Sequence, residues 1–123
     1  MTVVLDASAL LAFVQGEEGA DVVESALAGD ARCAAANWSE VARWVLAAGR
    51  DWPMIRGVVL AGYGVSVEPV LEADAEWAAR RWRRGENLSL GDRLCMALGE
   101  RLDADVLTAD TAWGSAGRVR QIR

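Results

Sequence analysis

The sequence predicts an α/β protein, with a mostly parallel central sheet flanked by helices in three layers. Short, apolar, strand-like segments alternate with helical segments along the chain, and this alternation favours right-handed crossovers between parallel strands. The 123 residues are 53% hydrophobic and 25% charged, which suits one folded domain over residues 1–123 that needs no disulfides. No apolar run reaches the ~18 residues of a transmembrane helix, so no membrane partner is expected.

The strand segments are short and bounded by turn residues. Thr2–Leu5 is apolar and β-rich, whereas Arg32–Ala36 is a weaker candidate because alanine is a poor strand former. Gly64–Glu68 alternates and stops at Pro69. The five expected strands are Thr2–Leu5, Arg32–Ala36, Gly64–Glu68, Asp105–Thr108 and Val119–Ile122.

The helical segments are recognised by their periodicity and their end signals. Glycines at positions 16 and 19 separate the first two, Gly49 ends the third, and Pro53 suits the first turn of the fourth. In the third, Val41, Trp44, Val45 and Ala48 are expected on one apolar face. The expected helices are Ala7–Gln15, Ala20–Ala28, Trp38–Ala48, Pro53–Ala61, Leu71–Arg84 and Leu90–Leu102.

The composition excludes several kinds of catalyst. The chain has no histidine, and all 13 basic residues are arginine. Histidine triads, histidine metal sites, Schiff-base lysines and phosphate-loop lysines are therefore absent. Cys33 and Cys95 lie in apolar stretches and predict buried thiols in a reducing cytoplasm, and the acidic start of the chain is not typical of a signal peptide.

Four acidic residues occupy equivalent places in the predicted fold. Asp6 and Asp110 follow strands, and Glu40 and Asp92 fall in the first turns of helices. Because the carboxyl ends of parallel strands and the starts of the following helices share one edge, the four acids are expected in one cleft. Carboxylates gathered in this way repel each other unless a cation neutralises them, and Mg²⁺ or Mn²⁺ accepts oxygen ligands alone.

Each of these acids also has a structural interpretation. Asn37–Glu40 and Ser89–Asp92 both fit a helix cap with an acid at the third helical position, and Asp6 and Asp110 fit as caps of the segments that follow. Capping is the better interpretation of any single acid, whereas the set of four favours function. The net charge of −5 and the pI of 4.7 argue mildly against a nucleic-acid partner. Without the four acids, however, 14 acidic residues face 13 arginines.

The sequence resembles the PIN-domain ribonucleases, and most of all the VapC-type toxins of bacterial toxin–antitoxin pairs. The resemblance covers essentially the whole chain and implies a parallel sheet between helices and RNA cleavage that depends on Mg²⁺ or Mn²⁺. One departure is Arg93, where many relatives carry a small residue. The matching segments are Val3–Leu10, Ser39–Val41, Leu88–Asp92 and Leu107–Asp110, with Trp113 beyond.

The resemblance also implies roles for individual residues. Asp6, Asp92 and Asp110 would hold the ion, with Glu40 as a further ligand or as the group that orients the attacking water. Ser8 and Thr108 are candidates for hydrogen bonds that aim these carboxylates. The alternative is that Ser8 only satisfies the first helical turn and that Thr108 is an ordinary strand residue.

By the same resemblance, the expected partners are an RNA substrate, a cognate antitoxin and a second copy of the chain. An antitoxin arginine matches an acidic cleft, because its planar fork binds carboxylates. The alternative function is a catalytically inactive PIN-like module that only binds a partner. A receiver domain is disfavoured because lysine is absent, and a haloacid-dehalogenase-type phosphatase because Asp6 lacks a second aspartate two residues later.

The arginines and tryptophans leave two questions open. Arg80, Arg81, Arg83 and Arg84 could contact RNA phosphates, or could complement the helix dipole and pair along the helix, as Glu76 with Arg80. Among the six tryptophans, Trp44 and Trp82 are expected in the core. The others, for which core packing is also favoured over RNA stacking or a partner surface, are Trp38, Trp52, Trp77 and Trp113.

Overall fold

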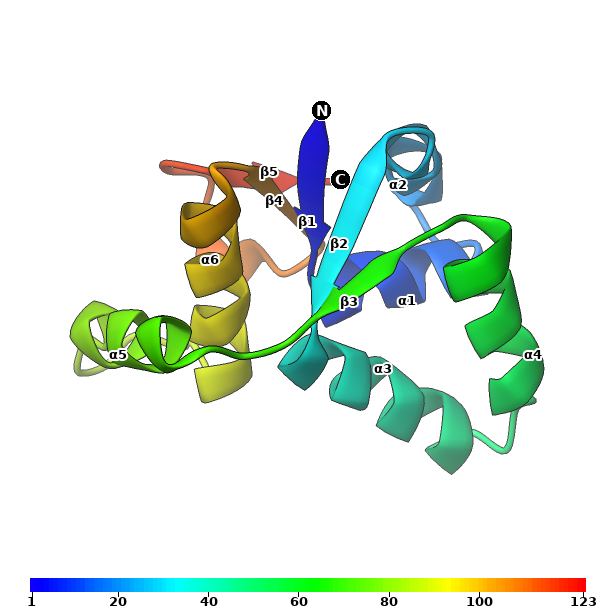
Figure 1. The fold of residues 1–123 in the computed structure, drawn as a ribbon, viewed down its shortest axis with the longest axis horizontal. Helices are drawn as coiled ribbons and strands as arrows, with labels where there is room; N and C mark the ends of the chain where they lie inside the picture. Colours follow the sequence, from blue (N-terminus) through cyan, green and yellow to red (C-terminus); the bar gives the residue numbers. More distant parts are fainter.

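The computed structural model describes residues 1–123 and contains one five-stranded sheet (Figure 1). Its order is β3-β2-β1-β4-β5, and all four pairings are parallel. The two outer pairs extend a centre made by β1 with its neighbours β2 and β4. The strands are β1 (Thr2–Leu5), β2 (Asp30–Ala34), β3 (Ser66–Glu68), β4 (Asp105–Thr108) and β5 (Val119–Gln121).

Six α-helices connect and cover the strands. α4 continues directly into a π-helical segment at 58–62, and a 3₁₀ turn at 111–113 follows β4. No helix combines the length and apolar character required to cross a bilayer. The helices are α1 (Ala7–Gln15), α2 (Ala20–Leu27), α3 (Ala35–Ala47), α4 (Trp52–Gly57), α5 (Glu72–Arg81) and α6 (Leu90–Leu102).

Alternating strand residues belong to two hydrophobic cores, one on each face of the sheet. Leu5 and Leu107 pack with residues of α1 to α4 on one face, whereas Val4 and Val106 pack with α6 on the other. This alternation is the consequence of the two-residue period of a strand. The three-layer arrangement predicted from the sequence is therefore present.

Most element boundaries match the sequence patterns, and the clearest differences lie around β2 and α5. β2 starts at Asp30 and passes straight into α3 at Ala35, so α3 begins three residues before the predicted Trp38. Its N-cap is Ala34, which provides no side-chain hydrogen bond. The prediction that Asn37 caps this helix was wrong, because Asn37 lies within it. α5 ends at Arg81 rather than Arg84.

The predicted core positions of two tryptophans were also wrong, because Trp44 is 43% exposed and Trp82 is 50% exposed. Trp113 is buried, as favoured from the sequence. In α3 the buried residues are Asn37, Val41 and Val45, spaced four residues apart. Trp44 lies beside this stripe because it is one position, about 100°, away from Val45.

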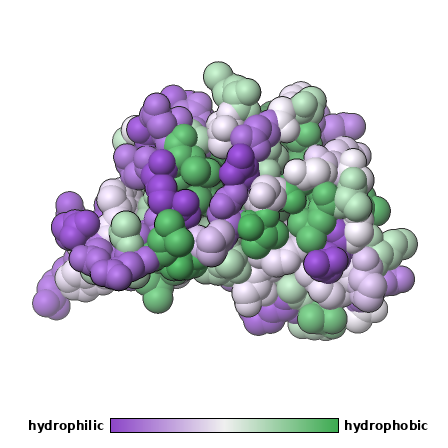
Figure 2. Space-filling model, viewed as in Figure 1, coloured by the Kyte–Doolittle hydropathy of each residue, from purple (hydrophilic) through white to green (hydrophobic).

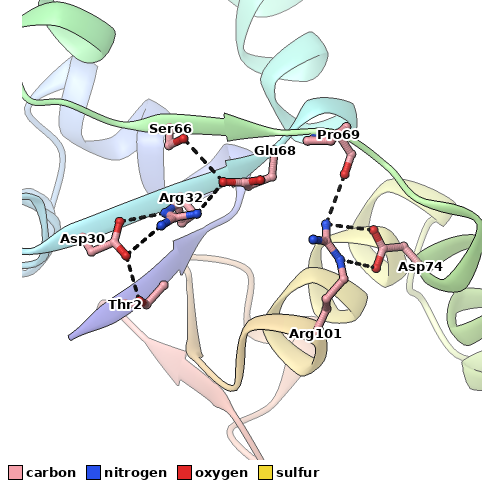
Figure 3. A network of polar contacts seen from close by, with 8 residues as sticks. All are labelled: Thr2, Asp30, Arg32, Ser66, Glu68, Pro69, Asp74 and Arg101. Atoms are coloured by element: carbon pink, nitrogen blue, oxygen red, sulfur yellow. Dashed lines mark hydrogen bonds and ion pairs between the residues drawn. The ribbon is translucent and has the colours of Figure 1, made fainter.

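Ion pairs hold the edge of the sheet and attach α5 to α6 (Figure 3). Arg32 of β2 bridges Asp30 and Glu68, which connects β2 with β3. Arg101 of α6 binds the buried Asp74 of α5 and the carbonyl of Pro69. A further bond runs from Arg93 to the carbonyl oxygen of Ala78, at 2.7 Å. α5 is thereby fixed to α6, its main neighbour.

The arginines at the end of α5 are only partly committed to contacts within the chain. Arg81 pairs with Glu86, and Arg83 donates to the carbonyls of Arg80 and Trp82. The predicted pair between Glu76 and Arg80 does not form. Hydrophilic side chains cover most of the projecting part of α5 (Figure 2).

Candidate active site

One pocket, at the carboxyl edge of the sheet, brings together all four acidic residues singled out in the sequence. It lies where the starts of α1, α3 and α6 meet, and its volume is about 220 Å³. A second hollow, of about 230 Å³, lies over the opposite end of α6 and has Glu100 as its only acid. The residues lining the acidic pocket are Asp6, Ala7, Ser8, Leu11, Asn37, Glu40, Arg43, Trp44, Asp92 and Asp110.

Asp6 lies deepest in the pocket and is only 4% exposed. Its carboxylate is the N-cap of α1 and accepts hydrogen bonds from the Ala9 amide, at 2.7 Å, and from the Thr108 hydroxyl, at 2.6 Å. Burial raises the pKa of Asp6 to about 6, although these hydrogen bonds and one from Ser8 act to lower it. The negative charge of Asp92 raises the pKa further.

Ser8 and Thr108 form a connected network around Asp6. The Ser8 hydroxyl lies 2.8 and 2.9 Å from the two Asp6 oxygens and accepts a hydrogen bond from the Ala109 amide. The Thr108 hydroxyl accepts from the Asp110 amide at 3.0 Å. The two hydroxyls therefore connect the Asp6 carboxylate to the segment after β4 that carries Asp110. Neither is only a helix-turn or strand residue.

Glu40 is positioned by two residues that the sequence interpretation did not assign to the site. The Asn37 amide nitrogen donates to Glu40 Oε1 at 3.0 Å and to the carbonyl of Gly91 at 3.2 Å. A Cβ atom at Gly91 would lie 2.9 Å from Glu40 Oε1, which is closer than side chains normally approach. The absence of a side chain at Gly91 is thus required for Glu40 to pack against the start of α6.

The capping interpretation is correct for three of the four acids. Besides Asp6, Asp92 forms a capping box with Ser89, and Asp110 accepts a hydrogen bond from the Ala112 amide at 2.9 Å. Asp92 and Asp110 each use one carboxylate oxygen for capping. Asp92 Oδ1, Asp110 Oδ2 and Glu40 Oε2 accept no hydrogen bond from the protein. Glu40, Asp92 and Asp110 therefore each keep one oxygen available, whereas both oxygens of Asp6 already accept hydrogen bonds.

The chemistry of this pocket fits a hard divalent cation. None of the four carboxylates forms an ion pair with an arginine, and the donor set consists of oxygen atoms. The buried Oδ1 of Asn37, in the pocket wall, has no hydrogen-bond partner. No three acidic or cysteine side chains gather tightly enough to make a metal centre by themselves. Water would complete the coordination, as is usual for Mg²⁺.

Two further residues of α3 reach the pocket, and both were missed from the sequence. Arg43 and Trp44 line it beside Glu40, and both are exposed. A signal was available, because Asn37, Glu40 and Trp44 follow the i, i+3, i+7 spacing of one helix face. This spacing was not recognised because Trp44 was assigned to the core face of the helix.

Comparisons with known proteins match this chain over most of its length. Residues 3–119 match the family model described as PIN domain. Ribonuclease VapC42 of Mycobacterium tuberculosis is 36% identical over 109 aligned residues, which cover 79% of this chain and 82% of the relative. The VapC ribonuclease Mb2780c of Mycobacterium bovis matches to the same extent.

Solved structures with higher sequence divergence share the fold. A toxin–antitoxin complex from Klebsiella pneumoniae has a TM-score of 0.78 at 16% identity, with 98% of each chain covered. VapC20 of Mycobacterium tuberculosis, described as a toxin that cleaves the sarcin–ricin loop, has a TM-score of 0.70 at 15% identity, with 94% of this chain and 95% of that chain covered. At these identities the likeness concerns the fold.

Proposed function

Since this chain belongs to the PIN-domain family, we propose that it is a VapC-type ribonuclease toxin that hydrolyses RNA phosphodiester bonds with a divalent cation. The observation that carries the proposal is the pocket in which four carboxylates converge without a neutralising ion pair. A purely structural set of caps does not require them to share one pocket. Their mutual repulsion would be relieved by a divalent cation, which also activates water and offsets negative charge in phosphodiester hydrolysis.

In this proposal Asp6, Asp92 and Asp110 hold Mg²⁺ or Mn²⁺, and Glu40 is a further ligand or orients the attacking water. A bound divalent ion supplies a lower pKa for a water molecule and positive charge against the phosphate. Ser8 and Thr108 fix the orientation of Asp6 through the hydrogen bonds that it accepts. Asn37 fixes the orientation of Glu40 in the same way, by donating a hydrogen bond to its carboxylate.

The partners follow from the same site. We propose a cognate antitoxin that covers the acidic pocket and places an arginine among its carboxylates, because the guanidinium fork matches their geometry. The Klebsiella structure with a similar fold is itself a toxin–antitoxin complex. A homodimer that sets two pockets beside one RNA track is part of the proposal. The free, buried thiols of Cys33 and Cys95 support a cytoplasmic location.

An inactive PIN-like binding module is the alternative function. It is disfavoured because such a module would have no need for four acids in one pocket, three of which keep an oxygen that accepts no hydrogen bond. No residue of the chain fills the pocket with a compensating ion pair. The alternative predicts partner binding without any RNA cleavage.

The decisive experiment measures RNA cleavage by the purified chain in Mg²⁺, in Mn²⁺ and in EDTA. We expect cleavage only with the ions. Asp6→Asn should lower the rate by at least ~100-fold while preserving the fold, because it removes a direct ligand. Glu76→Gln is the matched control, since Glu76 is exposed, unpaired and distant from the pocket. Full activity of Asp6→Asn, or cleavage in EDTA, would refute the proposal.

A further inference from the structure

We propose that Trp44 and Arg43 form a nucleotide-binding wall of the acidic pocket. Trp44 stacks on an unpaired RNA base beside the cleaved bond, and Arg43 binds a neighbouring phosphate. This inference rests on the proposed ribonuclease function and adds two residues that contact the substrate to the four carboxylates of the pocket.

The position of Trp44 is the first support. It lies one helical turn beyond Glu40 on α3 and lines the same pocket as the four acids. With 43% of its surface exposed, it offers a large apolar ring at the mouth of a highly charged hollow. Exposed aromatic rings can act as platforms for single-stranded nucleic acid, because every base has a face that can stack.

The lack of internal partners is the second support. The aromatic pairs in the chain are Phe13 with Tyr63 and Trp38 with Trp52, both at 5.1 Å between ring centroids. The one cation placed over an aromatic ring is Arg84, over Trp82. Trp44 takes part in none of these contacts and belongs to neither hydrophobic core. Core packing therefore does not account for it.

Arg43 provides the matching positive charge. It lines a pocket that contains four carboxylates, yet its side chain forms no ion pair with any of them and no hydrogen bond within the chain. α3 has no basic residue in its last turn, so the helix dipole does not explain Arg43 either. An uncommitted guanidinium beside an acidic pocket gives a phosphodiester one favourable contact where the surrounding charge repels it.

The geometry favours an unpaired base over a duplex. In A-form RNA the bases are stacked on each other, and the deep, narrow major groove excludes side chains. Stacking on Trp44 requires a base that has left this stack. Loops, bulges and single-stranded ends satisfy this requirement.

The test measures binding in the cleavage-deficient Asp6→Asn background with Mg²⁺ present. The probe is a fluorescein-labelled 12-nucleotide RNA of mixed sequence, used single-stranded and annealed to its complement, with fluorescence anisotropy as the readout. Adding Trp44→Ala should weaken single-strand binding roughly 5- to 160-fold, the range that corresponds to 1–3 kcal/mol for one stacked base. Trp44→Phe should recover most of the affinity. Trp82→Ala, which alters another exposed tryptophan outside the pocket, should change nothing.

Arg43 is tested through the salt dependence of the same binding. Arg43→Ala should reduce the slope of log affinity against log salt by about 1, because one phosphate contact is lost. Unchanged single-strand affinity in Trp44→Ala, or an equal loss for the duplex, would overturn the inference. So would a Trp44→Ala variant that binds RNA normally and loses only antitoxin binding, since Trp44 would then belong to a protein interface.

Cleavage by the otherwise wild-type chain separates this inference from the proposed function. If the chain cleaves RNA and Trp44→Ala leaves KM unchanged, the inference fails and the ribonuclease function stands. If the chain cleaves no RNA with either metal, the function fails, and the nucleotide-binding wall fails with it. A rise in KM with a smaller change in kcat is the expected result, because stacking holds the substrate without touching the reacting atoms.

Discussion

The buried carboxylate of Asp6 makes the stability of the metal-free protein depend on pH in a way that one substitution isolates. Burial raises its pKa from 3.8 to about 6 in the folded chain. The folded state therefore binds the Asp6 proton more tightly than the unfolded state does between these values. Folding stability from this group is fully present below pH 3.8 and is lost as the pH rises through 6.

The size of the effect follows from the two pKa values. The full difference corresponds to roughly 3 kcal/mol at 1.36 kcal/mol for each pKa unit. About 1.4 kcal/mol of this stability is lost between pH 5 and pH 8. The rest is lost below pH 5, because the unfolded chain begins to release the Asp6 proton there. Asp6→Asn removes the titrating group, so the free energy of unfolding of the variant should not carry this loss.

The assay is urea denaturation followed by tryptophan fluorescence, with EDTA present, at several values between pH 5 and pH 8. All other titrating groups act on both proteins, so the difference between their free energies of unfolding isolates Asp6. We expect this difference to move by about 1.4 kcal/mol in favour of the variant as the pH rises. Parallel pH profiles of the two proteins would refute the reasoning, because Asp6 would then not be desolvated.

Three other predictions concern the cation, Glu40 and the partners. Millimolar Mg²⁺ or Mn²⁺ should raise the melting temperature, because the ion binds the folded chain and the unfolded chain has no assembled site. If neither ion changes the melting temperature, the four acids have structural roles and are not metal ligands. Gly91→Ala should push Glu40 from its place and lower kcat about tenfold or more with an unchanged circular dichroism spectrum. Gly57→Ala, where a Cβ meets nothing within 4 Å, is its control, and equal activity of the two variants would count against a role for Glu40. Light scattering should show a dimer at micromolar concentration, and the antitoxin complex should lack ribonuclease activity; a strict monomer or an active complex would contradict the corresponding statement.

The fold was predictable because its strands and helices carry different periodicities. Thr2–Leu5 and Leu90–Leu102 have the bounds expected from the sequence. The convergence of the acids was predictable for a topological reason, since one edge of a parallel sheet collects strand ends and helix starts. The start of α3 could not be predicted, because the run Ala34–Ala36 contains no capping residue, glycine or proline to mark where β2 ends and α3 begins.

Side-chain direction within α3 was the main feature that sequence reasoning could not supply. A helical stripe 100° wide leaves residues at its margin that face either the core or a neighbouring pocket. Val45 faces the core and Trp44 the pocket, although they are adjacent in the chain. Which margin is covered depends on α1 and α6, whose positions are set by contacts distant in sequence.

The caps made by Asp6, Asp92 and Asp110 have a consequence for how tightly the proposed site would bind an ion. A free aspartate must give up rotational freedom when it coordinates, at roughly 0.5–1.5 kcal/mol for an immobilised side chain. Here that entropy is already lost when the helices form, since main-chain amides hold one oxygen of each carboxylate. In the proposed metal site the ligands would be preorganised by folding, and the cost would appear as repulsion among the carboxylates when no cation is bound.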